Sequence, residues 1–141
     1  MKKLFIDTDI IFDLLSAREP FYHASASLFS IVERREVKAF VSTLSISHLF
    51  YFLRKLKGSS EAIISLQKLK ALVSLLPVDE KTIDLSLISD FPDFEDAIQY
   101  HSALAEDIDY FITRNIGHYK KSRIKVVTAE EFIRIWPSRI K

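Results

Sequence analysis

Residues 1–9 read MKKLFIDTD, and this stretch decides the expected fold. Behind two lysines lies the unbroken apolar triplet LFI at positions 4–6. Such a run suits a strand buried on both faces of a parallel sheet better than an alternating surface strand. Asp7 would end that strand, and an acid at the carboxyl end of a strand in an open α/β sheet is a candidate functional residue. The alternative is a helix cap, with Thr8 or Asp9 capping the apolar run that follows.

The composition excludes several kinds of functional site. A chain of 141 residues fits one domain, residues 1–141, that buries about two thirds of its unfolded surface. With no cysteine, disulfides, thiolate metal sites and cysteine nucleophiles are excluded, and with only 2 glycines so are Gly-rich phosphate-binding loops. The 20 basic and 19 acidic residues give a formal charge of +1, which neither indicates nor excludes nucleic acid. We find no signal peptide and no membrane span, and therefore expect a soluble cytoplasmic protein.

Short β candidates alternate with helical patterns along the whole chain. The β candidates are residues 4–6, 39–41, 75–78, 109–113 and 125–128. The helical patterns are residues 9–16, 22–35, 46–57, a fourth helix that starts at 59, 79–88, 93–106 and 129–136. Thr43 or Ser45 can cap the third helix, and Pro77 confines its strand to the edge of the sheet. This alternation predicts a parallel α/β sheet with helices on both faces.

Three of the expected strands end on polar residues, namely Asp7, Asn115 and Thr128. If the strands are parallel neighbours, Asp7 and Asn115 face the same crevice, and Asp96 can approach it from the first turn of its helix. Carboxylates brought together in this way repel one another, and the usual remedy is a hard divalent cation such as Mg²⁺ or Mn²⁺. The alternative for the acids at 93–96 is helix capping and interaction with the helix dipole.

Histidines and clustered cations are further candidates. His48 lies in the first turns of the third expected helix, directly after a strand end, whereas His118 has no partner that the spacing identifies. Basic residues gather at Arg54 and Lys55, and again between positions 114 and 125. Such runs are usually solvated faces.

Four motifs, in this order and spacing, resemble the PIN-domain family over nearly the whole chain. They are FIDTD at 5–9, VSTLSIS at 41–47, DFEDA at 93–97 and YFITRN at 110–115. The resemblance is closest to single-domain bacterial members, many of which are ribonuclease toxins of toxin-antitoxin pairs. It implies a three-layer α/β/α fold with a parallel sheet of about five short strands, and a cluster of acids that binds Mg²⁺ or Mn²⁺ to cut RNA.

Matched position by position, the resemblance implies that Asp7 and Asp96 are the first and third family acids, both metal ligands. His48 stands where the second acid is normally a glutamate, and Asn115 stands where the fourth is normally an aspartate. Three further acids lie nearby as substitutes: Asp9, Asp93 and Glu95. Two carboxylates and an amide can hold one Mg²⁺ through several retained waters. The His48 imidazole would favour Mn²⁺ or another transition metal, or act as a general base or phosphate contact.

We therefore predict a metal-dependent endoribonuclease with a modified acidic site. Its expected catalytic residues are Asp7, Asp96, Asn115 and His48, of which Asp7, Asp96 and Asn115 bind the metal. Cations near the site screen the charge of the RNA phosphates, and the expected contacts are Arg54, Lys55 and Arg114.

Two alternatives belong to other classes. One is a catalytically degenerate PIN-like module that binds RNA or a protein. The other is a structural domain that forms a homodimer through the aromatic third helix, at residues 50–52. An antitoxin protein is a further expected partner, and no membrane association is expected.

Overall fold

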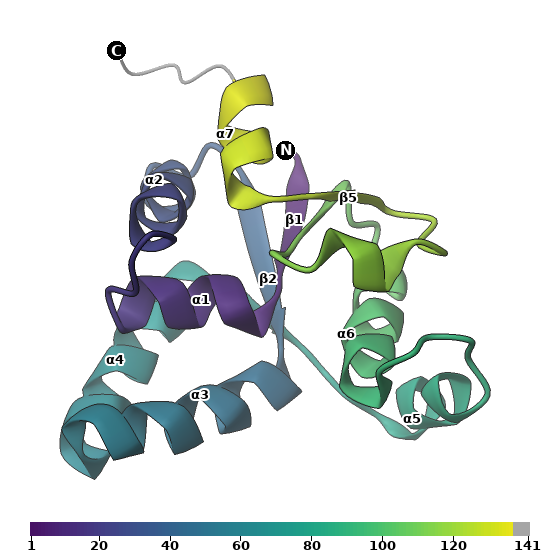
Figure 1. The fold of residues 1–141 in the computed structure, drawn as a ribbon, viewed down its shortest axis with the longest axis horizontal. Helices are drawn as coiled ribbons and strands as arrows, with labels where there is room; N and C mark the ends of the chain where they lie inside the picture. Colours follow the sequence, from purple (N-terminus) through teal and green to yellow (C-terminus); the bar gives the residue numbers. More distant parts are fainter. Residues whose placement is uncertain (137–141) are drawn as a thin grey trace.

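The computed structural model describes residues 1–136, which form one five-stranded sheet and seven α-helices (Figure 1). The strands are β1 (Lys3–Ile6), β2 (Lys38–Ser42), β3 (Ser74–Leu76), β4 (Tyr110–Ile112) and β5 (Lys125–Val127). All neighbouring pairs are parallel, in the order β3-β2-β1-β4-β5. The predicted parallel sheet of about five short strands is confirmed, with β3 at an edge.

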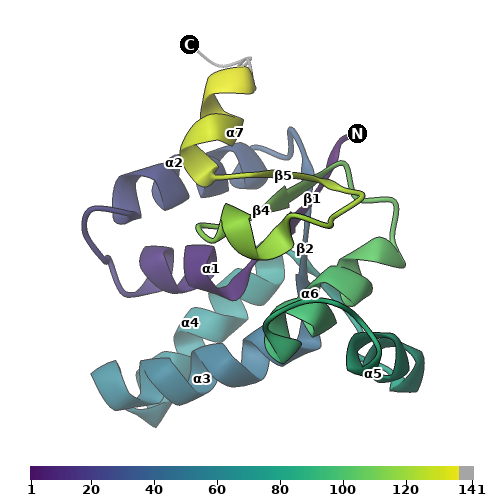
Figure 2. The same ribbon diagram turned by 45° about the vertical axis from the view of Figure 1, so that its right-hand side comes forward.

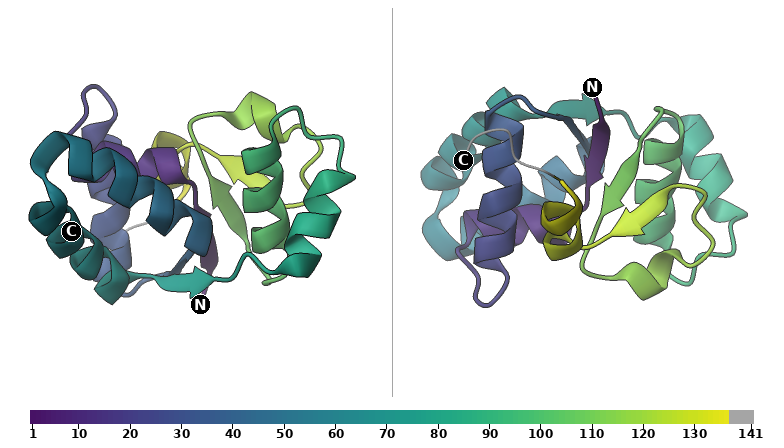
Figure 3. Two further views of the ribbon diagram at one scale, coloured as in Figure 1. Left: turned by 90° about the horizontal axis from the view of Figure 1, so that it is seen from below. Right: turned by 90° about the horizontal axis from the view of Figure 1, so that it is seen from above.

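Helices cover both faces of the sheet and make three layers (Figures 2 and 3). One face carries α1 (Thr8–Leu15), α2 (Tyr22–Glu33), α3 (Thr43–Lys57), α4 (Ser59–Leu72) and α7 (Ala129–Ile135). The other face carries α5 (Glu80–Leu87) and α6 (Phe94–Leu104), with the short 3-10 helix η1 (Ile116–Tyr119) near β5. No helix within residues 1–136 has the length and apolar character needed to cross a membrane.

The central strand β1 is buried on both sides, as its apolar triplet predicts. Leu4 and Ile6 belong to the core under the five-helix layer, and Phe5 belongs to the core under α6. Phe5 stacks on Phe111 of β4 with ring centroids 4.9 Å apart. Both faces of β1 are covered, so the three positions of the triplet require apolar side chains. Asp7 is the first residue after them whose side chain can be polar.

Two helix caps differ from the prediction. Asp7 itself caps α1, because its carboxylate accepts a hydrogen bond from the backbone N–H of Thr8 at 2.8 Å, whereas the alternative drawn from the sequence gave this role to Thr8 or Asp9. Ser42, rather than Thr43 or Ser45, caps α3. In both cases the helix begins immediately after the strand, so the residue that ends or follows the strand is also the cap.

Candidate active site at the strand ends

The strand order changes direction between β1 and β4, and ligands bind at such a point in open α/β sheets. Ile6 and Ile112 are paired across these two strands, so the residues that follow them lie side by side. The backbone N–H of Asp7 donates to the carbonyl of Ile112 at 2.9 Å, and the Thr113 hydroxyl donates to Asp7 Oδ2 at 2.9 Å. The sheet therefore places the end of β1 directly against the end of β4.

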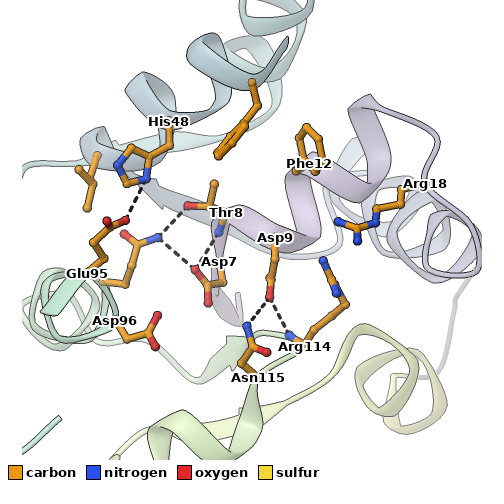
Figure 4. Close-up of a pocket in the computed structure, with 13 residues that line it drawn as sticks. Asp7, Thr8, Asp9, Phe12, Arg18, His48, Glu95, Asp96, Arg114 and Asn115 are labelled. Atoms are coloured by element: carbon orange, nitrogen blue, oxygen red, sulfur yellow. Dashed lines mark hydrogen bonds and ion pairs between the residues drawn. The ribbon is translucent and has the colours of Figure 1, made fainter. Parts of the chain in front are cut away.

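A cleft of about 360 Å³ opens at this point (Figure 4). Of the residues predicted from sequence, five line it: Asp7, His48, Asp96, Arg114 and Asn115. Arg54 and Lys55 lie further along α3 and do not line this cleft. Thr128, the third polar strand end, caps α7 by accepting from the Glu131 N–H at 3.1 Å.

Asp7 is only 6% exposed and accepts hydrogen bonds from four donors. Oδ1 accepts from the Thr8 N–H at 2.8 Å and from Gln99 Nε2 at 3.2 Å. Oδ2 accepts from the Thr113 hydroxyl at 2.9 Å and from the Tyr119 hydroxyl at 3.2 Å. These donors come from α1, α6, the end of β4 and η1, and together they hold the carboxylate in one orientation.

Gln99, which the sequence reasoning missed, is the centre of a buried polar network. Its Nε2 lies within hydrogen-bonding distance of Asp7 Oδ1, of Thr8 Oγ1 at 3.1 Å and of Ser45 Oγ at 2.9 Å. Its carbonyl oxygen accepts from the Ser42 hydroxyl. A signal was available, because residue 99 is three positions after Asp96 and therefore lies on the same face of α6.

The Tyr119 hydroxyl lies between two carboxylates, 3.2 Å from Asp7 Oδ2 and 3.1 Å from Asp96 Oδ1. Burial raises the pKa of Asp96, and the negative charges of Asp7 and then Asp93 raise it further. Burial is likewise the largest cause of a raised pKa at Tyr119. A hydroxyl has one proton, so it can donate to only one of the two carboxylates at a time.

Two histidines contact acids of the first turn of α6. His118 Nδ1 lies 2.9 Å from Asp96 Oδ2, so the expectation that His118 lacks a partner is wrong. The reason is that η1 folds back beside α6, which sequence spacing does not reveal. His48 Nδ1 lies 3.4 Å from Glu95 Oε2 at one side of the cleft (Figure 4).

Asp9 faces the loop after β4. Its Oδ2 accepts from the backbone N–H of Arg114 at 3.3 Å and from Asn115 Nδ2 at 3.1 Å (Figure 4). Its Oδ1 is shielded from solvent and accepts no hydrogen bond from residues 1–136. Burial and then the Asp7 charge raise the pKa of Asp9 to about 7, with Arg114 acting in the opposite direction.

The guanidinium of Arg114 points away from Asp9 toward Asp13, whose side chain is fully buried. Nε lies 2.8 Å from Asp13 Oδ2, and Nη2 donates to Oδ1 at 3.2 Å. The guanidinium also lies 4.2 Å from the ring centroid of Phe21. Arg18, a second cation in the lining of the cleft, is exposed and was not selected from the sequence.

A family model described as PIN domain matches residues 3–117. The chain belongs to the PIN-domain family. No curated protein has detectable sequence similarity to this PIN domain.

Solved structures share its fold at low identity. FitAB bound to an IR36 DNA fragment has a TM-score of 0.69 at 15% identity, covering 89% of this chain and 94% of that chain. A toxin-antitoxin complex from Klebsiella pneumoniae has a TM-score of 0.67 at 19% identity, covering 89% and 97%. VapC20 from Mycobacterium tuberculosis, named a sarcin-ricin loop cleaving toxin, has a TM-score of 0.62 at 15% identity, covering 77% and 86%.

The acidic centre of this PIN domain is sparse. Within the described part of the chain, residues 1–136, no group of three or more acidic or histidine side chains is arranged to hold a metal ion. His48 and Asn115 stand at the two positions where the resemblance leads us to expect acids. The carboxylates that line the cleft are Asp7, Asp9, Asp96 and Glu95.

Proposed function

We propose that this PIN-domain protein is a metal-dependent endoribonuclease that hydrolyses RNA phosphodiester bonds at a modified acidic site. The observation that carries the proposal is the sharing of the Tyr119 hydroxyl by Asp7 and Asp96 inside one cleft. Because that hydroxyl supplies a single proton, it cannot bond to both carboxylates at once, and the pair would be stabilised by a proton on Asp96, by His118 when its imidazole is charged, or by a bound cation.

A single divalent cation fits this donor set. Asp7 and Asp96 would hold it, and the side-chain oxygen of Asn115 is the third candidate ligand. Mg²⁺ often binds through one or two carboxylates and keeps several waters, whereas a contribution from His48 would favour Mn²⁺. When bound, such an ion polarises a phosphate and lowers the pKa of a water molecule.

The protein's own side chains supply the remaining parts of the proposed site. Arg18 is exposed in the lining of the cleft and is suited to contact a phosphate, whereas the guanidinium of Arg114 is engaged by Asp13. His48 is held through Nδ1 by Glu95, which leaves Nε2 as an acceptor for a proton from the attacking water.

An antitoxin is the proposed protein partner. The support is the fold that this chain shares with the toxin-antitoxin complex from Klebsiella pneumoniae. The homodimer and the cytoplasmic location stay predictions.

A second candidate function is an RNA-binding or protein-interaction module without catalysis. It is favoured by the four hydrogen-bond donors that already occupy Asp7 and by the missing acids at positions 48 and 115. A site of this kind would keep the cleft and its basic side chains but would bind a metal ion only weakly.

Thermal melting in EDTA, Mg²⁺ and Mn²⁺ tests the proposal, together with an RNA cleavage assay in the same ions. We expect an ion-dependent rise in Tm that disappears in Asp7→Asn, because a ligand that binds only the folded state stabilises it. Asparagine is also a good N-cap, so the substitution preserves the start of α1. Asp90→Asn, at an exposed acid outside the cleft, is the matched control and should keep the rise. RNA binding without cleavage in any ion would support the second candidate instead.

A further inference from the structure

A second hollow opens directly beside the cleft. Its volume is about 320 Å³, and it is lined by Ser47, His48, Tyr51, Phe52 and Glu95. His48, Phe52 and Glu95 also line the cleft, so the two spaces share a boundary. A hollow of a few hundred cubic ångströms can accept a small planar group.

The side of this hollow formed by α3 is aromatic. Tyr51 is 50% exposed and Phe52 is 47% exposed, whereas the adjacent Phe50 packs against the core. The Tyr51 and Phe52 ring centroids are 5.9 Å apart, and Phe52 lies 5.6 Å from Phe12 of α1. Two neighbouring large rings are thus exposed together at the edge of the acidic cleft. A single exposed apolar residue would need no explanation, whereas adjacent ones indicate a binding surface.

Cations flank the same rings. Lys55 Nζ lies 4.3 Å from the ring centroid of Tyr51, and Arg54 Cζ lies 5.8 Å from it. Neither side chain forms an ion pair with an acid of residues 1–136. Aromatic rings beside cations that form no ion pair are the combination that proteins use to bind single-stranded nucleic acid, with bases on the rings and phosphates on the cations.

We propose that Tyr51 and Phe52 form a stacking subsite for an unpaired nucleobase of single-stranded RNA, beside the phosphate that the acidic cleft receives. Arg54 and Lys55 contact the backbone phosphate of that nucleotide. The subsite rests on the proposed ribonuclease function and adds a position for one base beside its cleft. A base paired within a duplex is not free to stack on a protein ring.

The observations favour RNA over a protein occupant. The hollow adjoins the cleft at His48, Phe52 and Glu95, so a chain bound in the cleft passes next to the hollow. Lys55 lies over the Tyr51 ring, and lysine is depleted from the cores of protein interfaces. An anionic chain with planar groups suits two exposed rings that are flanked by Arg54 and Lys55.

The test is RNA binding by the full chain carrying Asp7→Asn, which prevents turnover during the measurement. The probes are fluorescent single-stranded oligouridine, the same strand annealed to oligoadenosine, and a ribose-phosphate oligomer without bases. Tyr51→Leu and Phe52→Leu should each weaken binding of the single strand by roughly tenfold, the order that stacking of one base on one ring supports. Binding of the base-free oligomer should stay unchanged.

Ring-retaining variants and a matched control separate stacking from structure. Tyr51→Phe and Phe52→Trp should bind like the parent, since a ring is still present. Leu56→Ala removes an exposed apolar side chain of the same helix outside the hollow and should also bind like the parent. Oligomeric state is measured in parallel by analytical ultracentrifugation.

Each other outcome overturns a defined claim. Unchanged RNA binding in the leucine variants overturns the subsite, as does a shift in oligomeric state shared by these variants and Leu56→Ala, which would identify a protein interface. In the chain with native Asp7, cleavage whose kcat and KM are unchanged by Tyr51→Leu and Phe52→Leu overturns the subsite but not the ribonuclease function. RNA binding that weakens in the leucine variants, with no cleavage in any ion, overturns the ribonuclease function but not the subsite. Absence of RNA binding overturns both.

Discussion

Asp9 and Asp13 lie one turn apart on α1 and both contact Arg114, yet their surroundings differ. Asp13 is fully buried, its Oδ1 accepts from Nη2, and its Oδ2 lies 2.8 Å from Nε in an ion-pair contact that is not a hydrogen bond. Asp9 receives only the backbone N–H of Arg114 and the Asn115 amide, and its Oδ1 accepts no hydrogen bond from residues 1–136. Burial is the first cause of a raised pKa at both carboxyl groups.

The difference separates a structural acid from a candidate functional one. The Asp13 charge is balanced within the fold, so this residue is suited to hold the loop after β4 against α1. Asp9 lies beside Asp7 in the cleft, where the described residues supply less positive charge than the acids need. Acids whose charge is left unbalanced in a cleft are the ones available to a cation or a substrate.

Arg114→Met removes the partner of Asp13 and should destabilise the fold strongly. Asp13 would stay buried without its partner, so we expect the free energy of unfolding to fall by about 3–5 kcal/mol. Urea denaturation measures the loss. The control is Lys121→Met, which removes the exposed ion pair with Asp90 and should cost less than about 1 kcal/mol. Equal losses in the two variants would contradict a structural role for the Asp13 pair.

Gln99→Met tests the buried polar network beside the cleft. The variant keeps the side-chain length but removes the amide that contacts Asp7, Thr8 and Ser45, so we expect a loss of about 1–3 kcal/mol in unfolding free energy. RNA cleavage should fall as well, because Asp7 loses one of its orienting donors. Gln67→Met, at an exposed position of α4, is the control for denaturation and cleavage, and neither should change.

Asp9→Asn has an expected stabilising effect whose size depends on pH. The folded-state pKa of Asp9 is about 7 against an ordinary 3.8, so between these values the folded chain holds a proton that the unfolded chain has released. The contribution of Asp9 to stability therefore falls as pH rises through this window. In EDTA the neutral variant should be more stable than the native chain near pH 8, by up to about 4 kcal/mol for the full shift, and equally stable near pH 4. An advantage that is the same at both pH values would show that titration of Asp9 is not its cause.

Much of the fold followed from local patterns. The triplet at residues 4–6 is buried on both faces, and all five expected strands are present. Short apolar runs bounded by polar or turn residues predict such strands, because burial of a strand involves only a few neighbouring positions. The rule that parallel strands end at one edge led to the expectation that Asp7 and Asn115 share a cleft, and both line it. The helix caps were harder, since α1 and α3 start at the strand ends without a loop.

Other parts of the site had no local signature. Tyr119 belongs to a four-residue 3-10 helix, which is too short to produce a periodic pattern. His118 meets Asp96 across 22 positions of sequence, and Gln99 reaches Asp7 across 92. Such contacts depend on how α6, η1 and the sheet pack together.

The order of apolar and polar residues along the chain predicts the parallel sheet and the end of it at which the acids gather, because burial period and strand ends are properties of neighbouring residues. Which acid is paired with a cation depends instead on how distant segments pack together. Asp9 and Asp13 are the same residue type on one helix, and the choice between them is made by a guanidinium 101 residues further along the chain than Asp13. Ion pairs and hydrogen bonds act over a few ångströms, so their outcome is set by the direction in which the Arg114 side chain points.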